Sequence, residues 1–87
     1  MYWVYVLRQS KTRELYIGKT NDLKRRLRDH QKGRQSATRR KDGEWRIVYA
    51  EMYISKRDAD ERERKLKQHG SNKRWLLERI KHSVFED

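Results

Sequence analysis

The 87-residue sequence has no cysteine and no proline, and its apolar runs are short. Without cysteine, disulfides and thiolate metal sites are excluded, and the redox compartment is left open. No apolar stretch approaches the ~20 residues that a membrane-spanning helix needs. The first residues, MYWVYVL, are too few for a secretion signal and lack its basic leader, so we expect a cytoplasmic location.

Repeats and low-complexity linkers are also missing, which favours one small domain over residues 1–87. Three tryptophans, five tyrosines and one phenylalanine are enough to organise a modest core, which argues against disorder.

Positive charge is present in excess. A net charge of +11 favours a polyanionic partner, because bound anions relieve the self-repulsion of a compact basic chain. Nucleic acid is the first candidate partner, an anionic membrane surface the second, and a basic structural protein is the third reading. Residues 1–50 carry 14 of the 24 Lys and Arg residues but only 5 of the 13 Asp and Glu residues.

The densest basic run is residues 24–41, where nine cations stand against one acid, Asp29. A basic helix followed by a basic arm predicts a surface that follows a nucleic-acid backbone. A solvated charged face is the alternative. The residues predicted to contact the backbone are Lys24, Arg25, Arg28, Lys32, Arg34, Arg39, Arg40 and Lys41.

Three segments rich in aromatic and β-branched residues predict strands at residues 1–9, 15–18 and 45–53. The first two are close enough to form a hairpin. If odd residues of one strand pair with even residues of the other, Tyr5 and Tyr16 lie side by side on one face. Gly18 is expected to end the second strand. Apolar residues on both faces of 45–53 predict a central, covered strand.

A first helix is predicted after the hairpin, capped by Thr20 or Asn21 and ended by Gly33. Leu23, Leu27 and His30 follow the helical spacing of an inward-facing stripe.

Two more helices are predicted after residue 53. Ser55 and Asp58 form a capping-box pattern for one that ends at Gly70, and Ser71 is expected to cap the next, which carries Trp75 and its apolar neighbours. The order β-β-α-β-α-α predicts an α/β fold with a three-stranded, mostly antiparallel sheet flanked by helices.

Glu63 falls between Ala59 and Leu66 on the face expected to be inward. An unpaired carboxylate there is costly, so Glu63 needs a cation, either a basic side chain or a metal. One carboxylate with water and phosphate oxygens is a common way to hold Mg²⁺. The alternative, which spacing favours, is an ordinary helix pair between Glu63 and Lys67.

Several other side chains suit phosphate chemistry. Arg26 is suited to holding a phosphate bidentately, although a surface cation is the simpler reading. Tyr5 and Tyr16 are candidates to orient or deprotonate a water, with Lys19 as the neighbouring cation that a phenol base requires. Half-buried sheet aromatics are the alternative for both tyrosines. His30 is a candidate for proton transfer or a satisfied core residue.

The order of these features resembles the GIY-YIG nuclease family over nearly the whole chain. YIGKTNDLKRRLRDH fits the family's second motif and its helix, while WRIVYAEMY and DADERERKLK match its third strand and its glutamate helix. The first motif departs from Gly-Ile-Tyr and reads Trp3-Val4-Tyr5, a form common in small members. Asn72 is too close in sequence to be assigned to an asparagine that some members use.

The resemblance implies DNA phosphodiester hydrolysis with one divalent ion, Mg²⁺ or in its place Mn²⁺. The family's two motif tyrosines then fall on Tyr5 and Tyr16, and its metal-binding glutamate falls on Glu63. The remaining family positions fall on Arg26, His30 and Lys19.

Together these observations predict a Mg²⁺-dependent endonuclease that selects DNA shape or, weakly, sequence, because phosphate contacts carry little sequence information. We expect DNA as the partner, no membrane and no small-molecule cofactor, with an accessory protein or a homodimer as further partners to consider. The rival prediction is a nucleic-acid-binding module without turnover that uses the basic 24–41 stretch.

Overall fold

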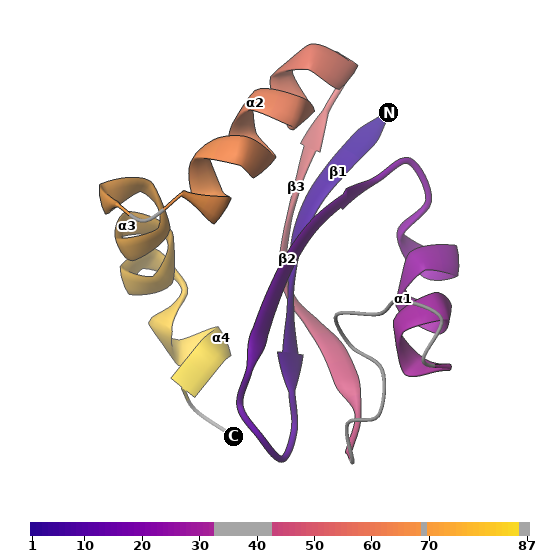
Figure 1. The fold of residues 1–87 in the computed structure, drawn as a ribbon, viewed down its shortest axis with the longest axis vertical. Helices are drawn as coiled ribbons and strands as arrows, with labels where there is room; N and C mark the ends of the chain where they lie inside the picture. The colour runs from indigo at the N-terminus through magenta and orange to yellow at the C-terminus, as the bar shows by residue number, and fades with distance from the viewer. Residues whose placement is uncertain (33–42, 69, 86–87) are drawn as a thin grey trace.

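The computed structural model describes residues 1–32, 43–68 and 70–85. Among them the order β-β-α-β-α-α is confirmed, as is the three-stranded antiparallel sheet with flanking helices, and a short fourth helix follows (Figure 1). The elements are β1 (Tyr2–Gln9), β2 (Leu15–Thr20), α1 (Leu23–Gln31), β3 (Trp45–Tyr53), α2 (Lys56–Lys67), α3 (Ser71–Arg79) and α4 (Lys81–Phe85).

β1 lies in the middle of the sheet and pairs antiparallel with β2 on one side and β3 on the other. Val4 and Val6 are buried in the cluster on one face of β1, and Tyr5 and Leu7 in the cluster on the other. The prediction that residues 45–53 form the central strand is therefore wrong. Within the described sheet, β3 is an edge strand.

The apolar residues on both faces of β3 reflect two helical layers. α1 contacts β3, and so do α2 and α4 from the opposite layer. Trp45 is buried, whereas Ile47 and Met52 of the same strand are exposed. An edge strand partly covered on both faces thus shows the pattern expected of a central strand.

The sheet separates two hydrophobic clusters (Figure 1). The layer of α2, α3 and α4 covers the cluster of Val4, Val6, Ile17, Ala59, Leu66, Leu76, Ile80 and Val84. On the other face, α1 packs its predicted inward stripe against β1. That cluster consists of Tyr5, Leu7 and Trp45, with Tyr16, Leu23, Leu27 and Ala50 partly buried around it.

Gly18 lies inside β2 and does not end it, because pairing with β1 continues through Thr20. The N-cap of α1 is Asp22 and not the predicted Thr20 or Asn21. Its Oδ1 accepts a hydrogen bond from the Arg25 backbone nitrogen at 3.1 Å. The prediction that Gly33 ends this helix falls outside the described residues.

Ser55 caps α2 as predicted, accepting a hydrogen bond from the Asp58 backbone nitrogen at 3.4 Å. α2 ends at Lys67, earlier than the predicted end at Gly70. Gly70 is instead the N-cap of α3, so Ser71 is the first residue of that helix and not its cap.

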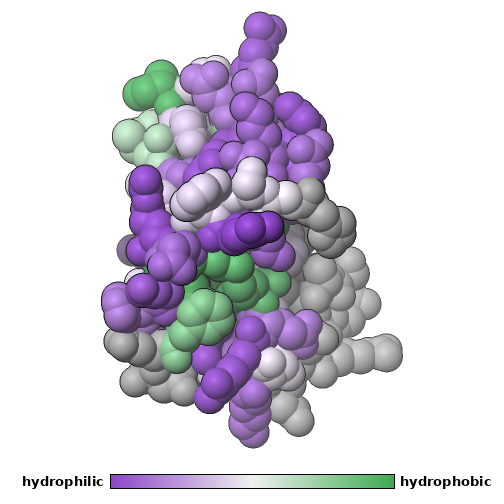
Figure 2. All heavy atoms as spheres, turned by 90° about the vertical axis from the view of Figure 1, so that its left-hand side faces the viewer, coloured by the Kyte–Doolittle hydropathy of each residue, from purple (hydrophilic) through white to green (hydrophobic). Residues whose placement is uncertain are grey.

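The outer face of the α2–α4 layer is mostly hydrophilic, with a smaller hydrophobic area below its middle (Figure 2). None of the described helices is both long enough and apolar enough to cross a membrane. Charged and polar groups therefore dominate the surface on which a partner would meet this layer.

Candidate active site

The site begins at the pairing of β1 with β2, which sets Tyr5 opposite Gly18 and Leu7 opposite Tyr16. This is the odd-to-even register, and it places both tyrosines on the face covered by α1. Their ring centroids are 6.2 Å apart. A Cβ on Gly18 would lie 2.5 Å from Tyr5 Oη and 2.9 Å from Tyr16 Cε1, so the close approach of both rings requires glycine here.

Tyr5 is bound to α1 through His30. Tyr5 Oη and His30 Nε2 form a buried hydrogen bond of 3.1 Å, and the Tyr16 ring meets the His30 ring edge-on at 4.5 Å between centroids. Burial, and then the nearby Arg26 guanidinium, lowers the pKa of His30, which favours the neutral imidazole. These three rings form one packed aromatic cluster.

Charged groups from two helices act on Tyr5. The pKa of its phenol is raised chiefly by burial and also by Tyr16 and Glu63, while the Arg26 guanidinium opposes this rise. Arg26 belongs to α1 and Glu63 to α2, so the two charges reach the same phenol from opposite helical layers. Because β2 is an edge strand of the described sheet, both layers can meet beside it.

Arg26 has an unsatisfied donor. Its Nε is buried and has no hydrogen-bond partner among the described residues. A buried donor left without an acceptor carries a desolvation penalty of about 1–3 kcal/mol. An anion bound beside the tyrosines would remove that penalty, and a phosphate oxygen is a suitable acceptor.

Glu63 lies on α2 between the buried residues Ala59 and Leu66, and its side chain is 23% exposed. Its Oε2 is 3.1 Å from Lys67 Nζ, so the helix pair expected as the alternative is present. The same carboxylate also acts on Tyr5 and on Lys19. The salt bridge and a role at the site are therefore compatible in this structure.

Lys19 projects from β2 toward α2, where its ammonium forms an ion pair with Asp60. This hydrogen bond is the main cause of the raised pKa of Lys19, and Glu63 adds to the rise. Asp60 also accepts a hydrogen bond from Lys56 at 3.2 Å, and these two lysines lower its pKa. Lys19 is therefore a cation near neutral pH and not a proton acceptor.

Four of the predicted backbone-contacting residues lie on α1 or at its end. Their side chains are exposed, which leaves them accessible to a polyanion. These residues are Lys24, Arg25, Arg28 and Lys32. The predictions for Arg34, Arg39, Arg40 and Lys41 fall outside the described residues.

The donor set suits a metal only when a substrate is also bound. In the described part of the chain, no group of three or more His, Cys, Asp or Glu side chains is placed to hold an ion. Glu63 supplies one carboxylate, and it acts on the same Tyr5 phenol as Arg26, whose Nε lacks an acceptor among the described residues. Mg²⁺ commonly takes one or two carboxylates, several waters and substrate phosphate oxygens, so Glu63 with a bound phosphate fits that ion.

Two residues of the site were missing from the sequence prediction. Gly18 was expected only to end a strand, yet it makes room for both tyrosines. Asp60 lies one helical turn before Glu63 and holds Lys19. The spacing of Asp60 and Glu63 was a usable signal, because residues three apart share one face of a helix.

Comparisons with known proteins agree with this fold. Residues 1–75 match the family described as the GIY-YIG catalytic domain. A UPF0213 protein of Oceanobacillus iheyensis is 34% identical over 67 residues, 77% of each chain, and one of Clostridium perfringens is 35% identical over 77 residues, 88% of this chain and 82% of the relative. The solution NMR structure of a UPF0213 protein from Bacillus halodurans has a TM-score of 0.56 at 30% identity, covering 93% of this chain and 86% of that one.

Proposed function

The chain belongs to the GIY-YIG family of nuclease domains, and from that premise we propose that it is a divalent-metal-dependent endonuclease that hydrolyses DNA phosphodiester bonds. One observation carries the proposal. The buried Arg26 Nε has no hydrogen-bond partner among the described residues, and the Arg26 charge acts on both Tyr5 and His30 of the aromatic cluster. An anion bound there would supply the missing acceptor.

Arg26 binds the scissile phosphate. Its guanidinium donates hydrogen bonds to the phosphoryl oxygens and stabilises the negative charge that grows on them during attack. Arg26 is placed in advance by α1, so little reorganisation is needed when the substrate arrives.

The two tyrosines differ in burial and therefore have different roles. Tyr5 is only 2% exposed and is hydrogen-bonded to His30, so it positions the cluster from behind. Tyr16 is half-buried and its ring meets the His30 ring edge-on, so its phenol is the one that contacts an attacking water. The neutral His30 imidazole is suited to accept a proton passed along the cluster.

Glu63 holds the divalent ion together with the substrate phosphate. When bound, such an ion neutralises charge on the phosphoryl and leaving oxygens. Lys19, kept protonated by Asp60, adds a fixed positive charge to the same side of the site. The exposed cations of α1 then bind flanking DNA backbone, which favours selection by DNA shape.

A nicking assay tests the proposal. Branched, flapped and linear DNA are incubated with the protein in Mg²⁺, in Mn²⁺ or with a chelator. We expect cleavage in metal and none with the chelator. Glu63→Gln should reduce the rate by about 10²-fold or more. Glu61→Gln, an exposed carboxylate two residues earlier on α2, is the matched control and should leave the rate within about twofold.

The rival prediction has a different outcome. A binding module without turnover would bind DNA in a salt-dependent manner, indifferent to metal and to Glu63→Gln. Full activity of Glu63→Gln would also reject the proposed site. Cutting of both strands by one site requires a homodimer, an accessory protein or two successive nicks, and the ratio of nicked to linear product distinguishes these routes.

A further inference from the structure

Trp75 is placed in an unusual way for a tryptophan. It lies on α3 and is 70% exposed, whereas Trp45 is 3% exposed. The sequence grouped Trp75 with the apolar residues of its helix, and of these Leu76 is buried. Tryptophan is usually largely buried, so a nearly free indole on a polar surface indicates a contact made with something else.

A hollow of about 180 Å³ opens beside this indole, between α2 and α3. No carboxylate among the residues that the structure describes lines it. Its lining consists of Arg62, Asn72, Trp75, Leu76 and Arg79.

Arg62, the α2 residue of the wall, is held in place. Its Nε and Nη2 donate hydrogen bonds of 2.7 and 3.2 Å to the two carboxylate oxygens of Glu51 on β3. The hydroxyls of Tyr49 and Tyr53 donate to the same carboxylate at 2.5 and 2.9 Å and hold it in turn. A side chain fixed by two hydrogen bonds to an anchored carboxylate is preorganised, which lowers the entropic penalty of binding.

The chemistry of the hollow fits an unstacked nucleobase. An indole face stacks on any base, and the exposed Arg79 guanidinium is free of that network and suited to bind an adjoining phosphate. The Asn72 amide offers both a donor and an acceptor to a base edge. Within duplex DNA, both faces of a base are covered by the bases stacked on it. This hollow therefore suits only a single-stranded segment.

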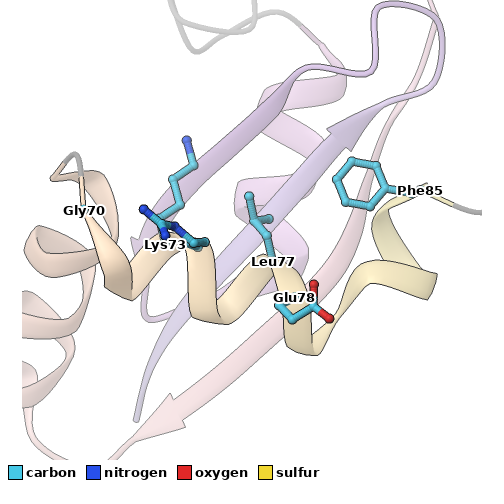
Figure 3. Close-up of a pocket in the computed structure, with 6 residues that line it drawn as sticks. Gly70, Lys73, Leu77, Glu78 and Phe85 are labelled. Atoms are coloured by element: carbon cyan, nitrogen blue, oxygen red, sulfur yellow. The ribbon is translucent and has the colours of Figure 1, made fainter.

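A second hollow on α3 lacks this combination. It measures about 400 Å³, and Leu77 and Phe85 point into it (Figure 3), with Lys73 and Arg74 also in its lining. Glu78 also lines it, and a carboxylate repels phosphate. Phe85 is 66% exposed and therefore supplies a matched aromatic control.

We propose that Trp75, with Asn72 and Arg79, binds an unpaired base in a single-stranded segment of the DNA substrate. The proposal rests on the proposed nuclease function and names its substrate class, DNA with a single-stranded arm. Arg62 and Glu63 are consecutive on α2, with Arg62 bound to β3 and Glu63 acting on Tyr5. The same helix, α2, thus carries a residue of the hollow and a residue of the site. A DNA substrate whose branch point lies at the site would place its single-stranded arm on α3.

Binding is measured by fluorescence anisotropy with a chelator present, so that no cleavage interferes. The probes are an oligothymidine strand, a flapped duplex and a blunt duplex of equal length. Trp75→Ala should lower the affinity for the single strand and for the flapped duplex by about tenfold, and the affinity for the blunt duplex by less than about twofold. Trp75→Phe should recover part of the loss, because phenylalanine also stacks. Phe85→Ala should change none of the three by more than about twofold.

Intrinsic fluorescence supplies a second readout. Oligothymidine should quench the wild-type emission, and Trp75→Phe should remove that quenching, because stacking on the indole is its cause. Arg79→Ala should weaken binding of the single strand and lower the slope of log affinity against log salt by about 1. Lys65 is an exposed cation of α2 outside the hollow, and Lys65→Ala should do neither.

Different results would reject the base-binding inference and the nuclease proposal. Unchanged affinity of Trp75→Ala for the single strand and the flap, with cleavage by wild type intact, would overturn the inference only. Equal weakening of all three DNAs would also overturn it, because it would show a general charge or folding effect. Selective loss of single-strand binding in a protein that cuts no DNA would support the hollow and reject the nuclease.

Discussion

At the scale of single residues, Gly18 lets two tyrosines and a histidine share one small space. A Cβ at this position would meet Tyr5 Cζ at 2.6 Å as well as the Tyr5 hydroxyl, and the ring is buried and hydrogen-bonded. The ring therefore cannot move aside without breaking its bond to His30. The second motif thus encodes a steric requirement in addition to the Tyr16 phenol.

Gly18→Ala is expected to lower the free energy of unfolding by ~1–3 kcal/mol, because overpacking a buried site forces neighbouring groups to shift. Urea unfolding followed by circular dichroism measures the change. Gly70→Ser is the control, since an added Cβ there meets no atom within 4 Å and serine suits its N-cap position. Equal stability of Gly18→Ala and wild type would show that the tyrosines do not pack as described.

His30 predicts a pH dependence of stability. Burial first, and then the Arg26 charge, lower its pKa in the folded protein, although Asp29 partly opposes this. The unfolded chain then binds more protons below the ordinary histidine pKa of about 6.5. The stability that neutral His30 contributes is fully present above that pKa and is lost as the pH falls below it.

Unfolding measured between about pH 7 and pH 5 should show a stability that declines with acidity. His30→Gln should make this decline shallower, while substitution of the exposed His82 should leave it unchanged. A decline of the same steepness in His30→Gln would show that other groups are responsible.

At the scale of elements, β3 is joined to α2 by a carboxylate with four donors. Burial alone would raise the pKa of Glu51, but the hydrogen bonds from Arg62, Tyr49 and Tyr53 outweigh it and lower that pKa. The same bond to Glu51, after burial, raises the pKa of Tyr49 to about 12. This network fixes the helix that carries Glu63.

Glu51→Gln is expected to lower the free energy of unfolding by ~1–3 kcal/mol, because hydrogen bonds to a charged, largely buried group are lost. Glu78→Gln, which breaks an exposed pair with Lys81, should change it by less than ~1 kcal/mol. Thermal or urea unfolding compares the two variants. A larger effect at Glu78 would mean that the β3–α2 network contributes little.

Element type and order follow from the sequence because alternation and helical spacing are local properties. The position of β3 at an edge does not, because two helical layers imitate the cover of a central strand. The capping role of Asp22 was also missed, since three neighbouring polar residues are all suitable caps. The roles of Gly18 and Asp60 depend on contacts with other segments, which no single stretch of sequence reveals.

At the scale of the whole molecule, a net charge of +11 makes any DNA affinity strongly dependent on salt. The exposed cations of α1 lie on the face of the sheet that also carries the tyrosine cluster. Under the proposed function, DNA backbone bound by α1 would therefore be delivered to Arg26 on the same helix. Contacts of this kind act on all sequences alike.

Arg25→Ala and Arg28→Ala should each reduce the slope of log affinity against log salt by about 1 for blunt duplex DNA, with no change in sequence preference. Lys81→Ala on α4 should leave the slope unaltered. Anisotropy titrations over a series of salt concentrations, with a chelator present, provide these slopes. Slopes that drop equally for α1 and α4 variants would indicate diffuse binding and no defined α1 surface.

The central claim is that Arg26 binds the scissile phosphate at one site together with the tyrosines and Glu63. The most direct test is the single-turnover cleavage rate in Mg²⁺ at saturating DNA, compared between Arg26→Ala and Arg25→Ala. The account predicts that Arg26→Ala slows cleavage by about 10²–10³-fold while Arg25→Ala, its exposed neighbour on α1, stays within about twofold of wild type. Cleavage by Arg26→Ala at the wild-type rate would contradict it.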